Sequence, residues 1–179
     1  MNAQLLHQQG SDAATVDLLA KVVSLQPVTP IEIEQLPAER RRVVSQVSRL
    51  TRDADFRRKV TRAYKQRCAV TRMQLRLLDA AHIFPVGAEG SNDEVNNGIC
   101  LSPTFHRAYD RGLIYLDEDL VMKINAKQAR ELARLDLDGG IADFKRYLGT
   151  RIHLPAKHSQ WPDVGLIKAA NESRRIKVA

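Results

Sequence analysis

Apolar residues recur at helical spacing through the N-terminal third of the chain. Residues 12–25 fit a short amphipathic helix, which Pro27 and Pro30 would end. A second helix can open with Pro37 in its first turn, and a third helical segment covers 53–66. We expect the apolar stripes of these two segments to pack in a core. The stripes are Val43, Val44, Val47 and Leu50 in the second helix, and Phe56, Val60 and Tyr64 in the third.

Beyond Arg67 the pattern changes from helical spacing to short apolar runs separated by turns. Residues 68–71 and 77–83 are strand-like. Residues 85–98 contain three glycines together with Asn, Asp and Ser, which indicates a loop. The run 99–101 resumes a strand, and the simplest connection makes it antiparallel to 77–83. The sequence therefore predicts a β-hairpin with a long connecting loop.

A short helix with recognisable ends follows this hairpin. Ser102 is a suitable N-cap, Pro103 fits the first helical position, and Gly112 is a usual C-terminal stop. These signals predict a helix over 103–111. The remaining elements are a second hairpin from 113–116 and 120–124, and helical pieces within 126–179, where Pro155 and Pro162 fall in loops.

Composition places limits on this picture. The chain has 179 residues, 44% of them hydrophobic and 27% charged, which suits one soluble domain or a domain with an extension. It contains no run of 18 apolar residues, and its start lacks the basic and apolar regions of a signal peptide. Cys68 and Cys100 are too few for a disulfide framework. We therefore expect no membrane association and a cytoplasmic location.

Charge is distributed unevenly around a formal net value of +7. Residues 1–39 carry one lysine against five acidic residues, whereas residues 40–67 carry eleven basic residues against Asp53 and Asp55. Such a block binds phosphate groups favourably through counterion release. A solvated helix face is the alternative interpretation. The position of the block just before the candidate site favours nucleic acid as the partner.

Three polar residues around the first hairpin and the helix after it are candidates for chemistry. His82, Asn97 and His106 follow one another at intervals of fifteen and nine residues. On the predicted helix, His106 and Asp110 are four residues apart, which brings their Cβ atoms to about 6 Å. One divalent cation could bind there, since imidazole accepts Zn, Mn, Ni or Co and carboxylate accepts Mg or Mn. A surface His–Asp pair is the plainer alternative.

His82 lies at the end of an apolar strand, where a histidine is commonly a satisfied core residue. The hairpin returns the chain beside it, however, and a neutral imidazole is a suitable general base for water. Asn97, before Gly98, could hold the loop or fix the His82 ring, although Asn–Gly is also a plain turn signal and Asn96 competes with it.

Two other faces of the helix 103–111 carry distinct residue types. Phe105 and Tyr109 are one turn apart and would anchor the helix in the core. Arg107 and Arg111 form another such pair, suited to a phosphate in front of a cation.

At these residues the chain resembles the HNH endonucleases, whose core is a β-hairpin followed by a helix around one metal ion. His82, Asn97 and His106 match the three letters of the motif. A longer run over roughly 53–160 resembles the branch of predicted restriction endonucleases. That run comprises Phe56-Arg-Arg-Lys-Val, Tyr64, Arg67-Cys-Ala-Val-Thr, Asp79-Ala-Ala-His82-Ile, Asn97-Gly98, His106-Arg-Ala-Tyr-Asp110-Arg-Gly-Leu and Ile152-His-Leu-Pro.

The resemblance implies an α+β fold with a ββα-metal core, as an HNH nuclease domain over 51–179 with further C-terminal helices. It does not explain residues 1–50, which the apolar spacing predicts to be an N-terminal helical extension. It implies hydrolysis of DNA phosphodiester bonds in restriction or defence, with one divalent cation, Mg before Mn or Ni. His82 would activate water, Asn97 would support the hairpin and the His82 ring, and His106 would bind the cation with Asp110 at a further ligand position. DNA contacts are expected from Arg58, Arg62, Lys65, Arg107 and Arg111.

Two positions depart from the family pattern. Many HNH enzymes carry a metal-ligating Asp or His immediately before the base, and that position here is Ala81. Asp79 is the nearest carboxylate and a candidate ligand, but alternation along a strand turns it away from His82 unless the strand bulges. The chain also lacks paired C-x-x-C sequences, since Thr71 and Pro103 follow the two cysteines at the third position, so no structural zinc is expected.

Two further hypotheses come from these departures and from the charge pattern. Ala81 is compatible with a non-catalytic DNA-binding or regulatory module that retains the HNH fold. The N-terminal extension, 1–50, in which residues 1–39 are acidic, could pair with a second copy or a partner subunit, or cover the basic surface. Cutting both DNA strands with a one-metal site needs two nicks or two copies.

Overall fold

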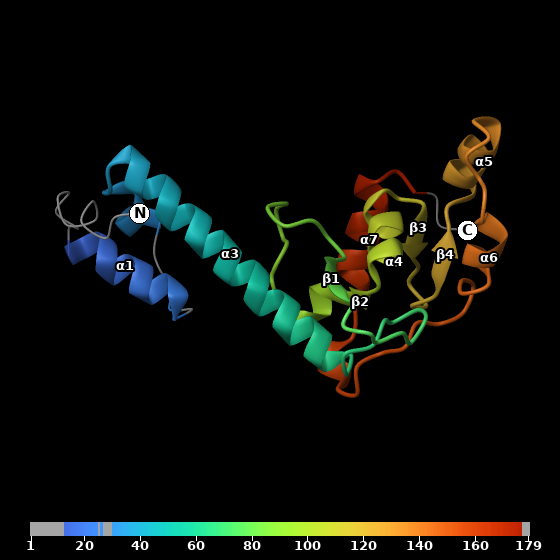
Figure 1. Ribbon diagram of the computed structural model, residues 1–179, viewed down its shortest axis with the longest axis horizontal. Coiled ribbons are helices and arrows are strands. Elements are labelled where there is room, and N and C mark those ends of the chain that lie inside the picture. Colours follow the sequence, from blue (N-terminus) through green and yellow to red (C-terminus); the bar gives the residue numbers. More distant parts are fainter. Residues whose placement is uncertain (1–12, 25, 27–29, 177–179) are drawn as a thin grey trace. The chain divides into compact units, whose positions relative to one another are not determined.

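The computed structural model describes residues 13–24, 26 and 30–176, which fall into two units, Met1–Asp55 and Phe56–Ala179 (Figure 1). The first unit contains α1 (Ala13–Val23), α2 (Pro30–Glu34) and the larger part of α3 (Ala38–Ala63). Among its described residues, a small core cluster contains the buried Leu18, Val22, Leu36 and Val44. The predicted helix over 12–25 corresponds to α1, and the predicted breaker Pro27 lies outside the described residues.

Two predictions for this region were wrong. Pro30 begins α2 instead of ending a helix, because proline lacks only an N–H that the first helical turn leaves unpaired anyway. The two helices expected from Pro37 and over 53–66 are one helix, α3. No glycine or proline occurs between Ala38 and Ala63, so a helix that has begun continues at little further cost.

The second unit is built around the predicted hairpin and helix. Strands β1 (Asp79–His82) and β2 (Gly98–Leu101) pair antiparallel, with Asp79 opposite Leu101 and His82 opposite Gly98. The short 3-10 helix η1 (Val95–Asn97) leads into β2, and α4 (Pro103–Asp110) follows it. The helix ends as predicted, since Gly112 has a φ of +67 and the Leu113 N–H donates to the Ala108 carbonyl at 2.9 Å.

The rest of the unit confirms the expected α+β class. Strands β3 (Ile114–Leu116) and β4 (Met122–Ile124) form the second predicted hairpin. The C-terminal region is helical in pieces, with both prolines between them. The pieces are α5 (Ala126–Arg134), α6 (Ile141–Lys145), the 3-10 helix η2 (His158–Gln160) and α7 (Val164–Ser173). Among the described residues, no helix combines the length and apolar character needed to cross a membrane.

The predicted strand at 68–71 was wrong, because this segment is a turn. The Arg72 N–H donates back to the Cys68 carbonyl at 3.0 Å and closes it. Ala69 links this turn to two other segments. Its N–H donates to the Cys100 carbonyl at 2.7 Å, and its carbonyl accepts from the His153 N–H at 2.8 Å. These two hydrogen bonds, one to each segment, hold the turn in place without forming a β-ladder.

Gly98 is required by close packing. A Cβ atom on this residue would lie 2.4 Å from Val60 Cγ2 and 3.0 Å from Phe56 Cζ. Both side chains are buried in the core of the second unit. The last turns of α3 can therefore reach β2 only because this position has no side chain.

We predict that Gly98→Ala lowers the free energy of unfolding by about 1–3 kcal/mol, because the core must shift to accommodate the methyl group. Urea denaturation of the full chain measures this change. Gly139→Ala is the matched control, since a Cβ there meets nothing within 4 Å. Equal loss of stability in both variants would contradict the packing argument.

Both cysteines are free thiols buried in the core. Burial, with smaller contributions from the neighbouring Cys68 and Asp79, raises the pKa of the Cys100 thiol to about 12. Ionisation of this thiol therefore opposes folding. The stability that the neutral thiol contributes is complete below the unfolded-state pKa of about 8.5 and is lost as pH rises toward 12.

We predict that the wild-type chain loses stability faster than Cys100→Ala between about pH 8.5 and pH 11. Urea unfolding at several pH values in this window measures the two slopes. Other groups titrate there in both proteins, so the difference between the slopes isolates this thiol. Parallel profiles would show that Cys100 titrates alike in the folded and unfolded chain.

Candidate active site

The site residues lie on β1, β2, α4 and the loop between the two strands. Because His82 pairs with Gly98, it lies beside the end of η1, where Asn97 precedes β2. Because Asp79 pairs with Leu101, it lies at the end from which the chain enters α4. Helix α4 packs against both strands. The two ends of one four-residue hairpin thus present different parts of the candidate site.

His82 is held on one ring edge and one ring face. Its Nε2 lies 3.1 Å from Asp93 Oδ1, and its ring stacks on Phe56 with centroids 3.7 Å apart and an interplanar angle of 10°. An ionised carboxylate only accepts hydrogen bonds, so this contact favours the tautomer with hydrogen on Nε2. In the part of the chain that the structure describes, nothing bonds to Nδ1. That atom is therefore available as a base.

Asn97 is fully buried and fastens the long loop to the hairpin. Its Nδ2 donates to the carbonyls of Phe84 at 3.1 Å and Asn92 at 2.8 Å, and to Ser91 Oγ at 3.3 Å. Its Oδ1 accepts from the Phe84 N–H at 2.8 Å. These bonds hold the loop that carries Asp93. Within the described residues no hydrogen bond joins Asn97 to the His82 ring.

His106 lies between two carboxylates. Its Nδ1 is 3.5 Å from Asp79 Oδ2, and its Nε2 is 3.3 Å from Asp110 Oδ2, the i, i+4 neighbour. Asp79 also pairs with Arg57 through a 3.3 Å contact. All four pairs of the β1–β2 ladder are regular, so the strand has no bulge. Asp79 and His82 accordingly have different partners, as alternation predicts.

The donor set around His106 suits a divalent cation. A neutral imidazole has one N–H and one lone pair, so one of its two nitrogens directs a lone pair at a carboxylate. Either a proton on the ring or a cation beside that nitrogen relieves the repulsion. One nitrogen and two carboxylates match the preferences of Mg, Mn and Ni. Among residues 13–24, 26 and 30–176, however, no three such side chains are already gathered as a metal site.

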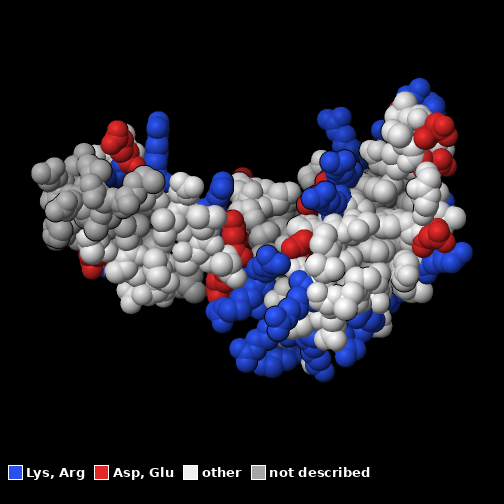
Figure 2. Space-filling model, in the orientation of Figure 1, with Lys and Arg blue, Asp and Glu red and all other residues white. Residues whose placement is uncertain are grey.

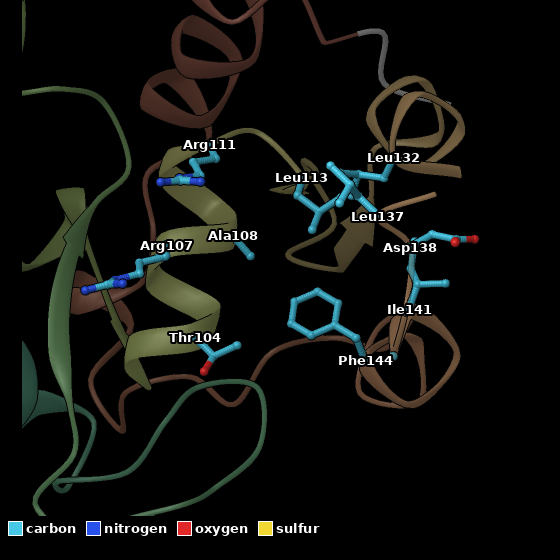
Figure 3. Close-up of a pocket in the computed structure, with 12 residues that line it drawn as sticks. Thr104, Arg107, Ala108, Arg111, Leu113, Leu132, Leu137, Asp138, Ile141 and Phe144 are labelled. Atoms are coloured by element: carbon cyan, nitrogen blue, oxygen red, sulfur yellow. The ribbon is translucent and has the colours of Figure 1, made fainter. Parts of the chain in front are cut away.

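The predicted DNA-contacting residues are exposed on two surfaces of the second unit. Arg58 and Arg62 lie on α3, Lys65 follows it, and Figure 2 shows Lys and Arg side chains gathered on the underside of this unit. Arg107 lies on α4 and Arg111 directly follows its last residue, both at the edge of a groove of about 480 Å³. Figure 3 shows both guanidinium groups on the side of α4 away from the groove's apolar residues, which include Leu113, Leu132 and Phe144.

Three residues of this site were missed in the sequence. Asp93 lies in a loop where its carboxylate has no periodic neighbour that would mark it. Arg57 was counted only in the basic run, yet it pairs with Asp79 and donates to the Leu78 carbonyl at 2.8 Å. Phe56 was assigned to the core, where it is buried, but its ring also stacks on His82. The stacking of an aromatic residue twenty-six positions before a histidine leaves no sequence signal.

Comparison with known proteins confirms the class suggested by the motif. Residues 68–117 match the model of an HNH endonuclease family. This match spans the turn before β1, the hairpin, α4 and β3, and it includes His82, Asn97 and His106. The second unit thus contains a segment that is similar to HNH endonucleases.

One solved structure that is similar to the chain is a modification-dependent restriction endonuclease, TagI. The two are 21% identical and superpose with a TM-score of 0.44, over 69% of this chain and 38% of that one. The chain therefore spans less than half the length of that protein. No curated protein matches the chain.

Proposed function

We propose that the protein is a divalent-cation-dependent endonuclease that hydrolyses DNA phosphodiester bonds, with His82 as its general base. The observation that supports this proposal is the set of contacts made by the His82 ring. Asp93 occupies Nε2, Phe56 covers one face, and Nδ1 has no partner among the described residues. An imidazole with one nitrogen held by a carboxylate and the other open suits the activation of water.

In the proposed reaction, His82 Nδ1 takes a proton from a water molecule, and the water oxygen forms a bond to phosphorus. The bond from phosphorus to the 3′ oxygen breaks, and that oxygen takes a proton from solvent. Asp93 then stabilises the imidazolium that forms, because its carboxylate already accepts from Nε2. It acts through His82 and is a positioning residue.

His106, Asp79 and Asp110 would hold the cation, with Mg preferred by the two carboxylates and Mn or Ni accepted by the imidazole. When bound, a divalent cation supplies positive charge to the phosphate and to the departing oxygen. Arg57 fixes the Asp79 carboxylate from the other side. Asp79 thus fills the role left open by Ala81, which bears no ligand atom.

The basic residues account for the choice of substrate. Arg107 and Arg111 project from the helix that carries His106, so they would contact phosphates close to the bond that breaks. Arg58, Arg62 and Lys65 would bind phosphates further along the duplex. DNA as the substrate, and restriction or defence as the setting, follow from the motif's resemblance. A second copy, or a partner subunit held through residues 1–50, would let a one-metal site cut both strands.

The alternative is a DNA-binding or regulatory module without catalysis. It is favoured by Ala81 and by the absence of a preassembled three-ligand group in the described part of the chain. This alternative predicts salt-sensitive binding to DNA with no cleavage in any metal.

We predict that His82→Ala slows plasmid cleavage by about 100-fold to 10,000-fold, the usual contribution of a general base. Asp93→Asn should give a smaller loss, because the base remains while its hydrogen-bond partner is weakened. Gel assays with Mg, Mn and Ni measure both rates. His158→Ala, which removes an exposed histidine outside the site, is the control and should cleave normally. Undiminished cleavage by purified His82→Ala would disprove the role of the base.

We also predict that the cation stabilises the fold. At a concentration about 100 times its Kd, a ligand that binds only the folded state adds about 2.7 kcal/mol, which raises the melting temperature by several degrees. Thermal melting with and without Mn or Ni measures this shift. His106→Ala should lose it and His158→Ala should keep it. An equal shift in both variants would place cation binding elsewhere.

A further inference from the structure

A four-residue turn just before β1 has an unusual sequence. The Leu77 N–H donates to the Gln74 carbonyl at 3.1 Å and closes the turn. Its two central residues, Leu75 and Arg76, have φ values of +46 and +54. Turns with positive φ at both central positions favour Asn–Gly, because side chains with a bulky Cβ substituent are strained there. A leucine and an arginine are poor choices for this backbone.

Packing within the chain does not compensate for this strain. Leu75 is 72% exposed, and its neighbours Met73 and Leu77 are 43% and 56% exposed. The turn and the residue before it therefore present three large apolar side chains to solvent. Strained residues that the fold itself does not need point to contact with something outside the chain.

The base of this segment is firmly attached, so the exposed side chains are presented in a set position. The Cys68 N–H donates to the Met73 carbonyl at 2.9 Å, and Cys68 itself is completely buried. On the other side, Arg57 donates to the carbonyl of Leu78, the buried residue that follows the turn. Contact at the turn would therefore cost little ordering of the backbone.

The surroundings of the turn are strongly basic and close to the candidate active site. Residues 56–78 contain eight basic side chains and no acidic one, and Arg72 and Arg76 flank Leu75 on an exposed surface. Leu75 is four residues from Asp79, so their Cα atoms are at most about 14 Å apart. In Figure 1 the segment runs between the end of α3 and β1. The turn is thus within about 14 Å of a proposed cation ligand, close enough for a duplex bound there to reach it.

We propose that Leu75 is a wedge that enters the minor groove of duplex DNA and separates two stacked base pairs, while Arg72 and Arg76 contact the phosphates on either side. The inference rests on the proposed action on DNA and adds the element that deforms the duplex. Apolar wedges flanked by basic residues unstack and bend DNA in this way. The excess of positive charge favours DNA over a protein partner or a second copy of this basic unit.

The test uses Leu75→Ser in the full chain with His82→Ala, which prevents cleavage during binding. The probe is a duplex of about 20 base pairs with 2-aminopurine at successive positions, since this base fluoresces more strongly when unstacked. We expect the parent chain, which carries only His82→Ala, to raise the 2-aminopurine fluorescence at one position of the duplex. Leu75→Ser should abolish the rise and bind about tenfold more weakly, as expected when a leucine is no longer buried.

Two further variants separate the wedge from the charges and from folding. Arg72→Ser should keep the fluorescence rise at saturation but reduce the slope of log affinity against log salt by about 0.9, the effect of one lost phosphate contact. The double variant Leu75→Asn with Arg76→Gly adopts the sequence that the turn prefers. It should melt at a higher temperature than the parent and still bind DNA more weakly. That combination could not come from misfolding.

Leu137→Ser is the matched control, since Leu137 is 65% exposed and lies outside the basic segment. Equal binding and fluorescence in Leu75→Ser, Leu137→Ser and the parent would overturn the wedge, whereas cleavage by the wild-type chain would still support the nuclease. A lower sedimenting mass in Leu75→Ser with unchanged DNA binding would assign the turn to a protein contact and also overturn it. If the parent does not bind DNA and the wild-type chain does not cleave it, both proposals fail.

Discussion

The candidate site depends on one constraint, the register of the β1–β2 pairing. With His82 opposite Gly98 and Asp79 opposite Leu101, the base lies beside Asn97 and the carboxylate lies where the chain turns into α4. A slip of one residue would exchange the two faces of both strands. His82 would then lose Phe56, and Asp79 would lose His106. Four backbone pairs thus decide whether the remaining groups can act together.

Side chains from outside the two strands fix the position of His82 once the register is set. Phe56 can lie flat on His82 because Gly98 leaves space for the end of α3. Asp93 can reach Nε2 because Asn97 fastens the preceding loop through its amide. The position of the base is therefore set by a helix, a strand and a loop. Such support from several rigid elements is what orients a catalytic group.

The parts of the fold that were predictable carry local signals. Pro103 and Gly112 mark both ends of α4, and the i, i+4 spacing placed His106 beside Asp110 before the fold was known. The single helix α3 was not predictable from its apolar residues, because their two stripes are equally typical of two shorter helices. The contacts of Asp79 with His106, and of Asp93 with His82, join residues far apart in sequence. Pairings of that kind have no period or cap, so only the tertiary structure reveals them.

The burial of the Asn97 amide also affects how readily this residue deamidates. Asparagine is a thermolabile residue, and a following glycine leaves its side-chain amide open to attack by the next backbone nitrogen. In the folded chain the Asn97 amide is held by Phe84, Ser91 and Asn92. Loss of ammonia would leave a carboxylate facing the Phe84 and Asn92 carbonyls, where it has no proton to donate and is costly to bury. Deamidation of this one residue would then release the loop. The fold protects the Asn97 side-chain amide from this reaction by holding it in place.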